Sequence, residues 1–251
     1  MPSGVRVRLP PWAPKQVFTQ ISFATATHKV HIISPEEVTL GNLKIPESDR
    51  LCFVIIRVND YTNSLSNAER SFANAVSEVR RKQYSSGRRA VQLGLSSFNV
   101  TEIPILFDDR KPSWPVSIVG SIAHSNSLAV AMIGIKQDFR GVGIDILPKR
   151  AVSDKVRDRI LLEEELQVVL RGGDRDWPTM FFCAKESIYK ASNPETDEFL
   201  GFRDVCVRFN QSGTEFSAVT VLEKQSTDLI ATGRGYVFEV ENHWLTVFLI
   251  S

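Results

Sequence analysis

The feature that most constrains the fold is that helical segments followed by strand-like segments occur twice along the chain. The first helical segment spans residues 66–98, where apolar residues recur at helical spacing, and we expect either two helices or one helix broken near Gly87. The runs VSIVGSIAHS, LAVAMIG and GVGIDIL then predict three successive strands. Hairpin turns at residues 125–127 and at KQDFRG are expected to join them.

The second batch begins with the helical stretch AVSDKVRDRILLEEELQVVL, which a Gly-Gly pair ends, and continues with a second helix over residues 177–192. Four runs then alternate or stay apolar, as the strands of an antiparallel sheet do; they cover residues 204–210, 215–223, 233–240 and 243–250. Ahead of both batches, residues 1–64 contain strand-like runs at 20–33 and 51–60. We therefore predict an α+β protein made of two similar subdomains, each with a small, mainly antiparallel sheet packed on helices.

Composition excludes several classes of function. The 30 basic and 29 acidic residues leave a formal net charge of +1, so no global field attracts nucleic acid or an anionic membrane. The longest apolar run, residues 128–135, is far shorter than the ~18 residues that a membrane span requires, and from the Pro and Trp among residues 1–14 we expect no secretory signal. Cys52, Cys183 and Cys206 are widely spaced in apolar surroundings, as reduced core thiols are. We expect a cytoplasmic protein.

The run FFCAKESIYKA, residues 181–191, places apolar residues on one helical face and Glu186 with Lys190 on another. Taken alone, these two residues also fit an exposed ion pair between successive turns, worth ~0.3–0.5 kcal/mol. Asp145 interrupts the apolar strand GVGIDIL, and burying its carboxylate without a partner would cost several kcal/mol. Asp145 therefore either caps the next turn or binds a hard cation such as Mg²⁺, which typically takes one or two protein carboxylates.

Two further features are candidates for binding anions. His124 ends the strand-like run GSIAH before a turn, where a lone histidine is either a structural hydrogen-bonding group or a functional one. The cluster RRKQYSSGRR, residues 80–89, concentrates positive charge in a nearly neutral chain. Such a cluster is either a solvated helix face or a phosphate site, and Arg88 follows a glycine. A nucleic-acid-binding module would need a recognised fold signature and a basic domain, and neither is present.

In order along the chain, GRRAVQL, RKPSWP, GSIAHS, GVGID and FFCAKESIYKA resemble motifs of the 4′-phosphopantetheinyl transferases, over roughly residues 75–195. The resemblance is to the surfactin- and enterobactin-synthetase type, whose members are pseudo-dimeric single chains, and the RKPSWP and GSIAH motifs favour the enterobactin-like branch. It implies two subdomains in a pseudo-twofold arrangement. We place the N-terminal subdomain at residues 1–140 and the C-terminal subdomain, with the metal and catalytic motifs, at residues 141–251.

The resemblance implies transfer of the 4′-phosphopantetheine arm of coenzyme A to a serine hydroxyl of an apo acyl or peptidyl carrier protein, with 3′,5′-adenosine bisphosphate leaving. Asp145 and Glu186 would bind Mg²⁺ beside the pyrophosphate, and Lys190 would contact the transferring phosphate. The base would be Glu186 or a bound water. The implied contacts of coenzyme A are Arg88, Lys111, His124 and Lys185.

Two positions depart from the family pattern. Leu147 stands where many members carry a third acidic residue, two positions after Asp145, and Ala123 replaces a serine often found before the histidine. Leucine cannot bind metal, so a coenzyme A-binding pseudoenzyme without turnover is an alternative. The resemblance further implies a monomer, since one chain contains both halves, and a role in siderophore or secondary-metabolite biosynthesis.

Overall fold

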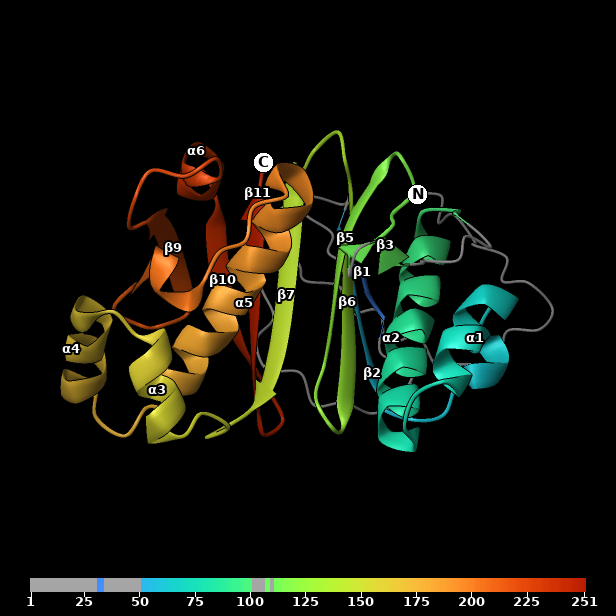
Figure 1. The fold of residues 1–251 in the computed structure, drawn as a ribbon, viewed down its shortest axis with the longest axis horizontal. Coiled ribbons are helices and arrows are strands. Elements are labelled where there is room, and N and C mark those ends of the chain that lie inside the picture. The colour runs from blue at the N-terminus through green and yellow to red at the C-terminus, as the bar shows by residue number, and fades with distance from the viewer. Residues whose placement is uncertain (1–30, 34–50, 101–106, 109–110) are drawn as a thin grey trace, which may run out of the picture.

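A computed structural model describes residues 31–33, 51–100, 107–108 and 111–251, and its helices and strands form four layers (Figure 1). Two sheets pack face to face at the centre, helix α2 (Glu78–Ser97) covers the outer face of the first sheet, and helix α5 (Trp177–Thr196) covers the second. The short helix α1 (Asn67–Asn74) lies on the outer side of α2.

The first sheet has the strand order β1-β2-β6-β5, in which β1 pairs parallel with β2 and the other pairs are antiparallel. Its strands are β1 (His31–Ile33), β2 (Leu51–Arg57), β5 (Ile118–His124) and β6 (Leu128–Ile135). A two-stranded ribbon of β3 (Phe107–Asp108) and β4 (Lys111–Pro112) precedes β5, and a 3-10 turn, Thr62–Ser64, precedes α1.

The second sheet is fully antiparallel, with the order β7-β11-β10-β9-β8. Its strands are β7 (Gly141–Pro148), β8 (Val205–Phe209), β9 (Glu215–Thr220), β10 (Arg234–Val240) and β11 (His243–Ile250). The remaining elements are α3 (Asp154–Ile160), α4 (Glu163–Arg171), the 3-10 turn η2 (Phe202–Asp204) and α6 (Thr227–Ala231). The α+β class with mainly antiparallel sheets is confirmed.

The two sheets share a pairing pattern. In the first sheet β2 pairs with the last strand of that sheet along the chain, β6, and in the second sheet β7 pairs with the last strand, β11; the strand that precedes the last one, β5 or β10, lies next. This common order supports two similar subdomains. The first sheet is built from residues up to 135 and the second from residue 141 onward, while the exact boundary at residue 140 stays a prediction.

The long apolar runs follow from burial on both faces of the strands. On β2, Leu51, Phe53 and Ile55 point into the core between the sheets, whereas Cys52 and Val54 point toward α2. Side chains alternate across a strand, so a strand covered on both sides reads as continuously apolar.

Residues 66–98 form two helices, as the first of the two alternatives expected, and the other alternative, a break near Gly87, is wrong because α2 runs unbroken through that glycine. The chain breaks instead after α1, where the hydroxyl of Ser77 accepts a hydrogen bond from the backbone N–H of Arg80 and begins α2. A Cβ at residue 87 would lie 2.9 Å from the Ile122 side chain, so this glycine serves the close packing of helix on sheet.

The single helix expected over residues 151–170 was also wrong, because it divides into α3 and α4. The residues between them, Leu161 and Leu162, are extended, and the Glu165 carboxylate accepts the Leu162 backbone N–H at 2.8 Å. Three consecutive acidic residues in the first turn of α4 favour a new helix start there.

The turn at residues 125–127 joins β5 and β6 as expected, but KQDFRG does not form a hairpin, because β6 and β7 belong to different sheets. Most of the strand-like run at residues 20–33 falls outside the described residues; only His31–Ile33 is seen as a strand. Among the described residues, no helix is both long enough and apolar enough to traverse a bilayer.

Candidate active site

The site begins with the glycines of β7, because they let α5 lie directly on this strand. Gly141, Gly143 and Asp145 alternate with the core residues and so share one face. A Cβ at residue 141 would lie 2.1 Å from the carbonyl oxygen of Ala191, and one at residue 143 would lie 1.8 Å from that of Ser187. No side chain fits at either position, so the motif GVGID brings Asp145 against the helix.

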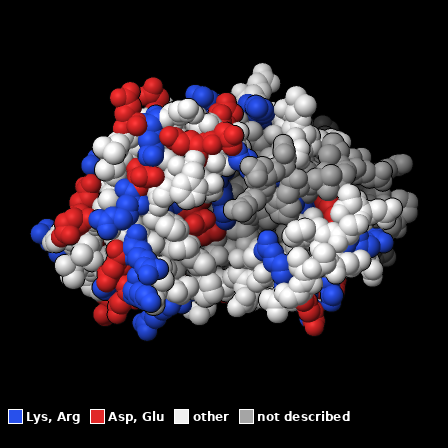
Figure 2. Space-filling model, viewed as in Figure 1, with Lys and Arg blue, Asp and Glu red and all other residues white. Residues whose placement is uncertain are grey.

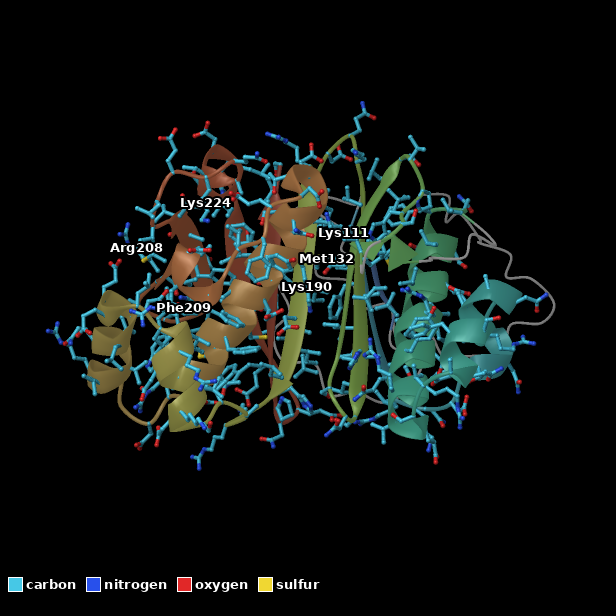
Figure 3. The ribbon with its side chains drawn as sticks, in the orientation of Figure 1. Lys111, Met132, Lys190, Arg208, Phe209 and Lys224 are labelled. Carbon is cyan, nitrogen blue, oxygen red and sulfur yellow. The ribbon has the colours of Figure 1, made fainter. Side chains whose placement is uncertain are left out.

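Lys190 of α5 occupies the space beside Asp145. Its ammonium Nζ donates to Asp145 Oδ1 at 2.7 Å and to the carbonyl oxygen of Ile144 at 3.2 Å. Burial works to lower the pKa of Lys190, but the carboxylates of Asp145 and Glu186 outweigh it, and the pKa is raised. Lys190 therefore stays protonated and places a fixed positive charge between α5 and β7 (Figure 3).

Glu186 lies one helical turn before Lys190 and is half-buried. Burial raises the pKa of Glu186, and the negative charge of Asp145 raises it further, although Lys190 opposes both effects. The structure therefore brings Asp145, Glu186 and Lys190 close enough to interact electrostatically. The group consists of the Asp145 carboxylate, the Glu186 carboxylate with its raised pKa, and the Lys190 ammonium.

These groups fit Mg²⁺ rather than a closed metal cage. Within the described ranges, no cluster of three or more His, Cys, Asp or Glu side chains is placed to hold a metal ion. Mg²⁺ usually takes one or two carboxylates and completes its octahedron with waters and substrate phosphates. Leu147 shares the Asp145 face of β7 and supplies no oxygen ligand.

His124 reaches this group from the first sheet. Burial, with the charges of Arg80 and Lys190, lowers the pKa of His124 to about 4, so the imidazole is neutral near pH 7. Arg80 Nη1 lies 2.7 Å from His124 Nε2, which must be the accepting nitrogen because a guanidinium only donates. Its Nδ1 has no hydrogen-bond partner among the described residues. Arg80, a residue that sequence reasoning did not assign to the site, thus joins it from α2.

Lys185 lies elsewhere, although it precedes Glu186 in the sequence. Its side chain is buried, and its Nζ donates to the Glu165 carboxylate at 2.7 Å, to Phe202 O at 2.7 Å and to Ile160 O at 2.9 Å. An ammonium has three N–H groups, so all of them are used within the protein. The predicted contact with coenzyme A would require Lys185 to give up one of these partners.

The other two residues predicted to bind coenzyme A, Arg88 and Lys111, form no described contact with Asp145. Arg88 is 3% exposed, with its Nε 3.7 Å from a Glu69 carboxylate oxygen and its guanidinium over the Tyr84 ring, on the α1 side of α2. Lys111 forms an ion pair with Asp197, which follows the C-terminus of α5, and so joins the two halves. Figure 3 shows Lys111 and Lys190 in the region between α5 and the strands of the first sheet.

A pocket of about 140 Å³ opens beside Glu186. One wall comes from α5 through Lys185, Glu186 and Tyr189, and the other from the segment 199–205. The pocket lining is mainly apolar, and the Tyr189 and Phe199 rings lie 6.1 Å apart. This pocket was not predicted from the sequence. The apolar run FLGF at residues 199–202 is the sequence feature that could have indicated it.

Comparison with known proteins gives two adjoining matches. A family model described as the 4′-phosphopantetheinyl transferase N-terminal domain matches residues 68–134, and one described as the 4′-phosphopantetheinyl transferase superfamily matches residues 141–246.

Individual relatives agree with these matches. The chain is 34% identical over 138 residues to 4′-phosphopantetheinyl transferase PptT of Mycobacterium tuberculosis, covering 54% of this chain and 61% of that protein. It is 32% identical over 115 residues to enterobactin synthase component D of Salmonella typhi, covering 45% and 48%. The chain thus spans less than two thirds of the length of these relatives. Among solved structures, Thermotoga maritima holo-acyl-carrier-protein synthase matches with 20% identity and a TM-score of 0.37, covering 45% of this chain and 64% of that one.

Proposed function

The chain belongs to the 4′-phosphopantetheinyl transferase superfamily, and from this membership we propose that it moves the 4′-phosphopantetheine arm of coenzyme A onto a serine hydroxyl of an apo carrier protein. The observation that carries the proposal is the meeting of Asp145, Glu186 and Lys190 with His124 between the two halves. A pyrophosphate substrate needs such a mixture of cation-binding oxygens and N–H donors.

In the reaction, the serine oxygen attacks the phosphorus on the pantetheine side of the pyrophosphate. A P–O bond to serine forms, the bond from that phosphorus to the bridging oxygen breaks, and 3′,5′-adenosine bisphosphate leaves with the electron pair. Glu186 accepts the serine proton as the general base. Lys190 donates to the phosphate oxygens that gain charge in the transition state.

Asp145 and Glu186 are the residues that would hold Mg²⁺, which when bound supplies positive charge to the pyrophosphate oxygens. His124, kept neutral by its low pKa, carries its proton on Nδ1, and its ring is proposed to lie beside the phosphates of coenzyme A. Arg80 holds the imidazole in this tautomer by occupying Nε2.

The pocket beside Glu186 suits the arm itself. Its lining is mainly apolar, and it borders the carboxylate that would deprotonate serine, so the arm could extend there while its phosphate stays beside Lys190. Arg88 and Lys111 stay predicted contacts of the phosphates of coenzyme A. Both would have to exchange or share their present acidic partners, Glu69 and Asp197.

The proposal extends to location and assembly. The buried thiols of all three cysteines suit a reducing, cytoplasmic compartment, and the two sheets of one chain suit a monomer. Acidic and basic side chains are interspersed on the face shown in Figure 2, which favours a protein partner over nucleic acid. Siderophore or secondary-metabolite synthesis is the proposed setting.

The test incubates the protein with coenzyme A, Mg²⁺ and an apo carrier protein, and follows the carrier by mass spectrometry. We expect a mass gain of one phosphopantetheine arm with the wild type and no gain with Glu186→Gln, whose amide keeps the shape of the acid but accepts no proton. Thermal unfolding of the variant should match the wild type. Tight binding of coenzyme A without any mass gain would identify a binding protein instead, and normal transfer by Glu186→Gln would contradict the assigned base.

A further inference from the structure

The buried ion pair between Lys185 and Glu165 stands apart from the charges of the active site. The Lys185 side chain is 2% exposed and that of Glu165 is 1% exposed, yet the two belong to separate helices, α5 and α4. Buried charges are retained only where they are fully paired and hydrogen-bonded. Here both are.

Glu165 uses both carboxylate oxygens to join three elements. One oxygen accepts the backbone N–H of Val207 on β8 at 2.9 Å, and the other accepts Leu162 N–H at 2.8 Å and Lys185 Nζ at 2.7 Å. The carboxylate therefore fixes the start of α4, strand β8 and helix α5 relative to one another.

Lys185 extends the same network to the wall of the pocket beside Glu186. Its bond to Phe202 O holds η2, and its bond to Ile160 O holds the end of α3. The segment from Phe199 to Val205 forms the pocket wall that faces Glu186 and Tyr189. Lys185 is part of the α5 wall and donates a hydrogen bond to the opposite wall at Phe202, so it sets the distance between the two walls.

We propose that Lys185 and Glu165 are a pair of positioning residues, which hold the wall formed by residues 199–205 at its distance from Glu186, and that Lys185 does not itself bind coenzyme A. The inference rests on the proposed function, since this pocket is the one assigned to the phosphopantetheine arm. It differs from the phosphate contact implied by the family resemblance, because a saturated ammonium has no free N–H for a phosphate.

The experiment is a double-mutant cycle of Lys185→Met, Glu165→Gln and the double variant, with Glu164→Gln as control. Glu164 precedes Glu165 on α4, but its side chain is 58% exposed, pairs with the exposed Arg208 and accepts a hydrogen bond from the Cys206 thiol. We measure kcat and KM for carrier loading, and the binding of adenosine 3′,5′-bisphosphate, which has phosphates but no arm.

Each single change leaves a buried charge unpaired, and we expect kcat to fall about tenfold or more because the pocket wall moves. Binding of adenosine 3′,5′-bisphosphate should stay within about twofold of wild type, since no phosphate contact is lost. The double variant, with no unpaired charge, should recover part of the loss, so the two effects are not additive. The control should behave as wild type.

A direct contact of Lys185 with phosphate gives the opposite pattern. Lys185→Met would then weaken adenosine 3′,5′-bisphosphate binding, while Glu165→Gln would leave both binding and kcat unchanged; that result would overturn the proposal. If Lys185→Met fails to fold, Glu165→Gln and the double variant still decide between the two patterns.

Backbone hydrogen exchange separates this inference from the proposed function. Amides of residues 200–205 should exchange faster in each single variant than in wild type or in Glu164→Gln, whether or not any carrier is loaded. An unchanged exchange rate in both single variants would refute the positioning role even if the wild type proves to be a transferase. A wild type without transfer, combined with faster exchange in the variants, would refute only the proposed function.

Discussion

Gly143→Ala is the most direct test of how the active site is assembled, because it changes one methyl group and no charge. The added Cβ would lie 1.8 Å from the carbonyl oxygen of Ser187 and 2.8 Å from the backbone N of Ala191. An ordinary carbon–oxygen contact is ~3.3 Å, so α5 must move from β7 by roughly 1.5 Å. Both obstacles are helix backbone, which a rotamer change cannot relieve.

The magnitude follows from two opposing effects. Overpacking of this kind destabilises by ~1–3 kcal/mol, and the reduced freedom of the unfolded chain offsets ~0.4–1 kcal/mol. A net loss of about 1–2 kcal/mol lowers the Tm of a chain of this size by roughly 2–8 °C. Catalysis should suffer more, because the shift separates Lys190 and Glu186 from Asp145, and a misplacement of ~1 Å can reduce the rate about 100-fold.

The assay pairs thermal unfolding by circular dichroism with carrier loading by mass spectrometry. Gly134→Ala on β6 is the matched control, since its Cβ would meet only side chains, Phe139 at 3.1 Å and Leu51 at 3.2 Å. We expect that variant to lose little stability and no transfer activity. If Gly143→Ala melts and transfers like wild type, α5 does not depend on close contact with β7 and the reasoning fails.

Three further predictions concern ionisable groups. Asp145→Asn should raise the Mg²⁺ concentration needed for half-maximal transfer several-fold, because one carboxylate ligand is lost; an unchanged Mg²⁺ titration would point to other ligands. The pKa of His124 falls from 6.5 unfolded to about 4 folded, so the unfolded state binds more protons between these values and stability should decrease as pH drops from about 6.5 to 4. Urea unfolding across this range should show a shallower pH dependence for His124→Gln than for wild type, and equal slopes would count against a depressed pKa. Burial raises the pKa of Cys52 to about 11 and, with Glu164, that of Cys206 to about 12, and it also raises the pKa of Cys183. A thiol reagent at pH 8 should therefore label none of the three before denaturation, and rapid labelling of the native protein would refute their burial.

The sequence determined the class of fold and the motifs, because both depend on local patterns. Apolar runs such as LCFVII predicted strands, and the hydrophobic spacing of residues 66–98 predicted helices. Both predictions succeed because the hydrophobic period of a helix or strand depends only on consecutive residues. The family resemblance was confirmed as well, because its motifs are short and ordered along the chain. Asp145, Glu186 and Lys190 were named as candidates on the same local grounds.

Only the tertiary structure decided which residues meet. The hairpin expected between β6 and β7 was wrong because β7 pairs with β11, about 100 residues away, and no local signal encodes that choice. Lys185 and Glu186 are neighbours in the motif, yet a rotation of ~100° per helical residue sends one to Glu165 and the other toward Asp145. Spacing along the chain predicts the helix face on which a side chain lies. Which residues pack against that face depends on how distant segments of the chain come together.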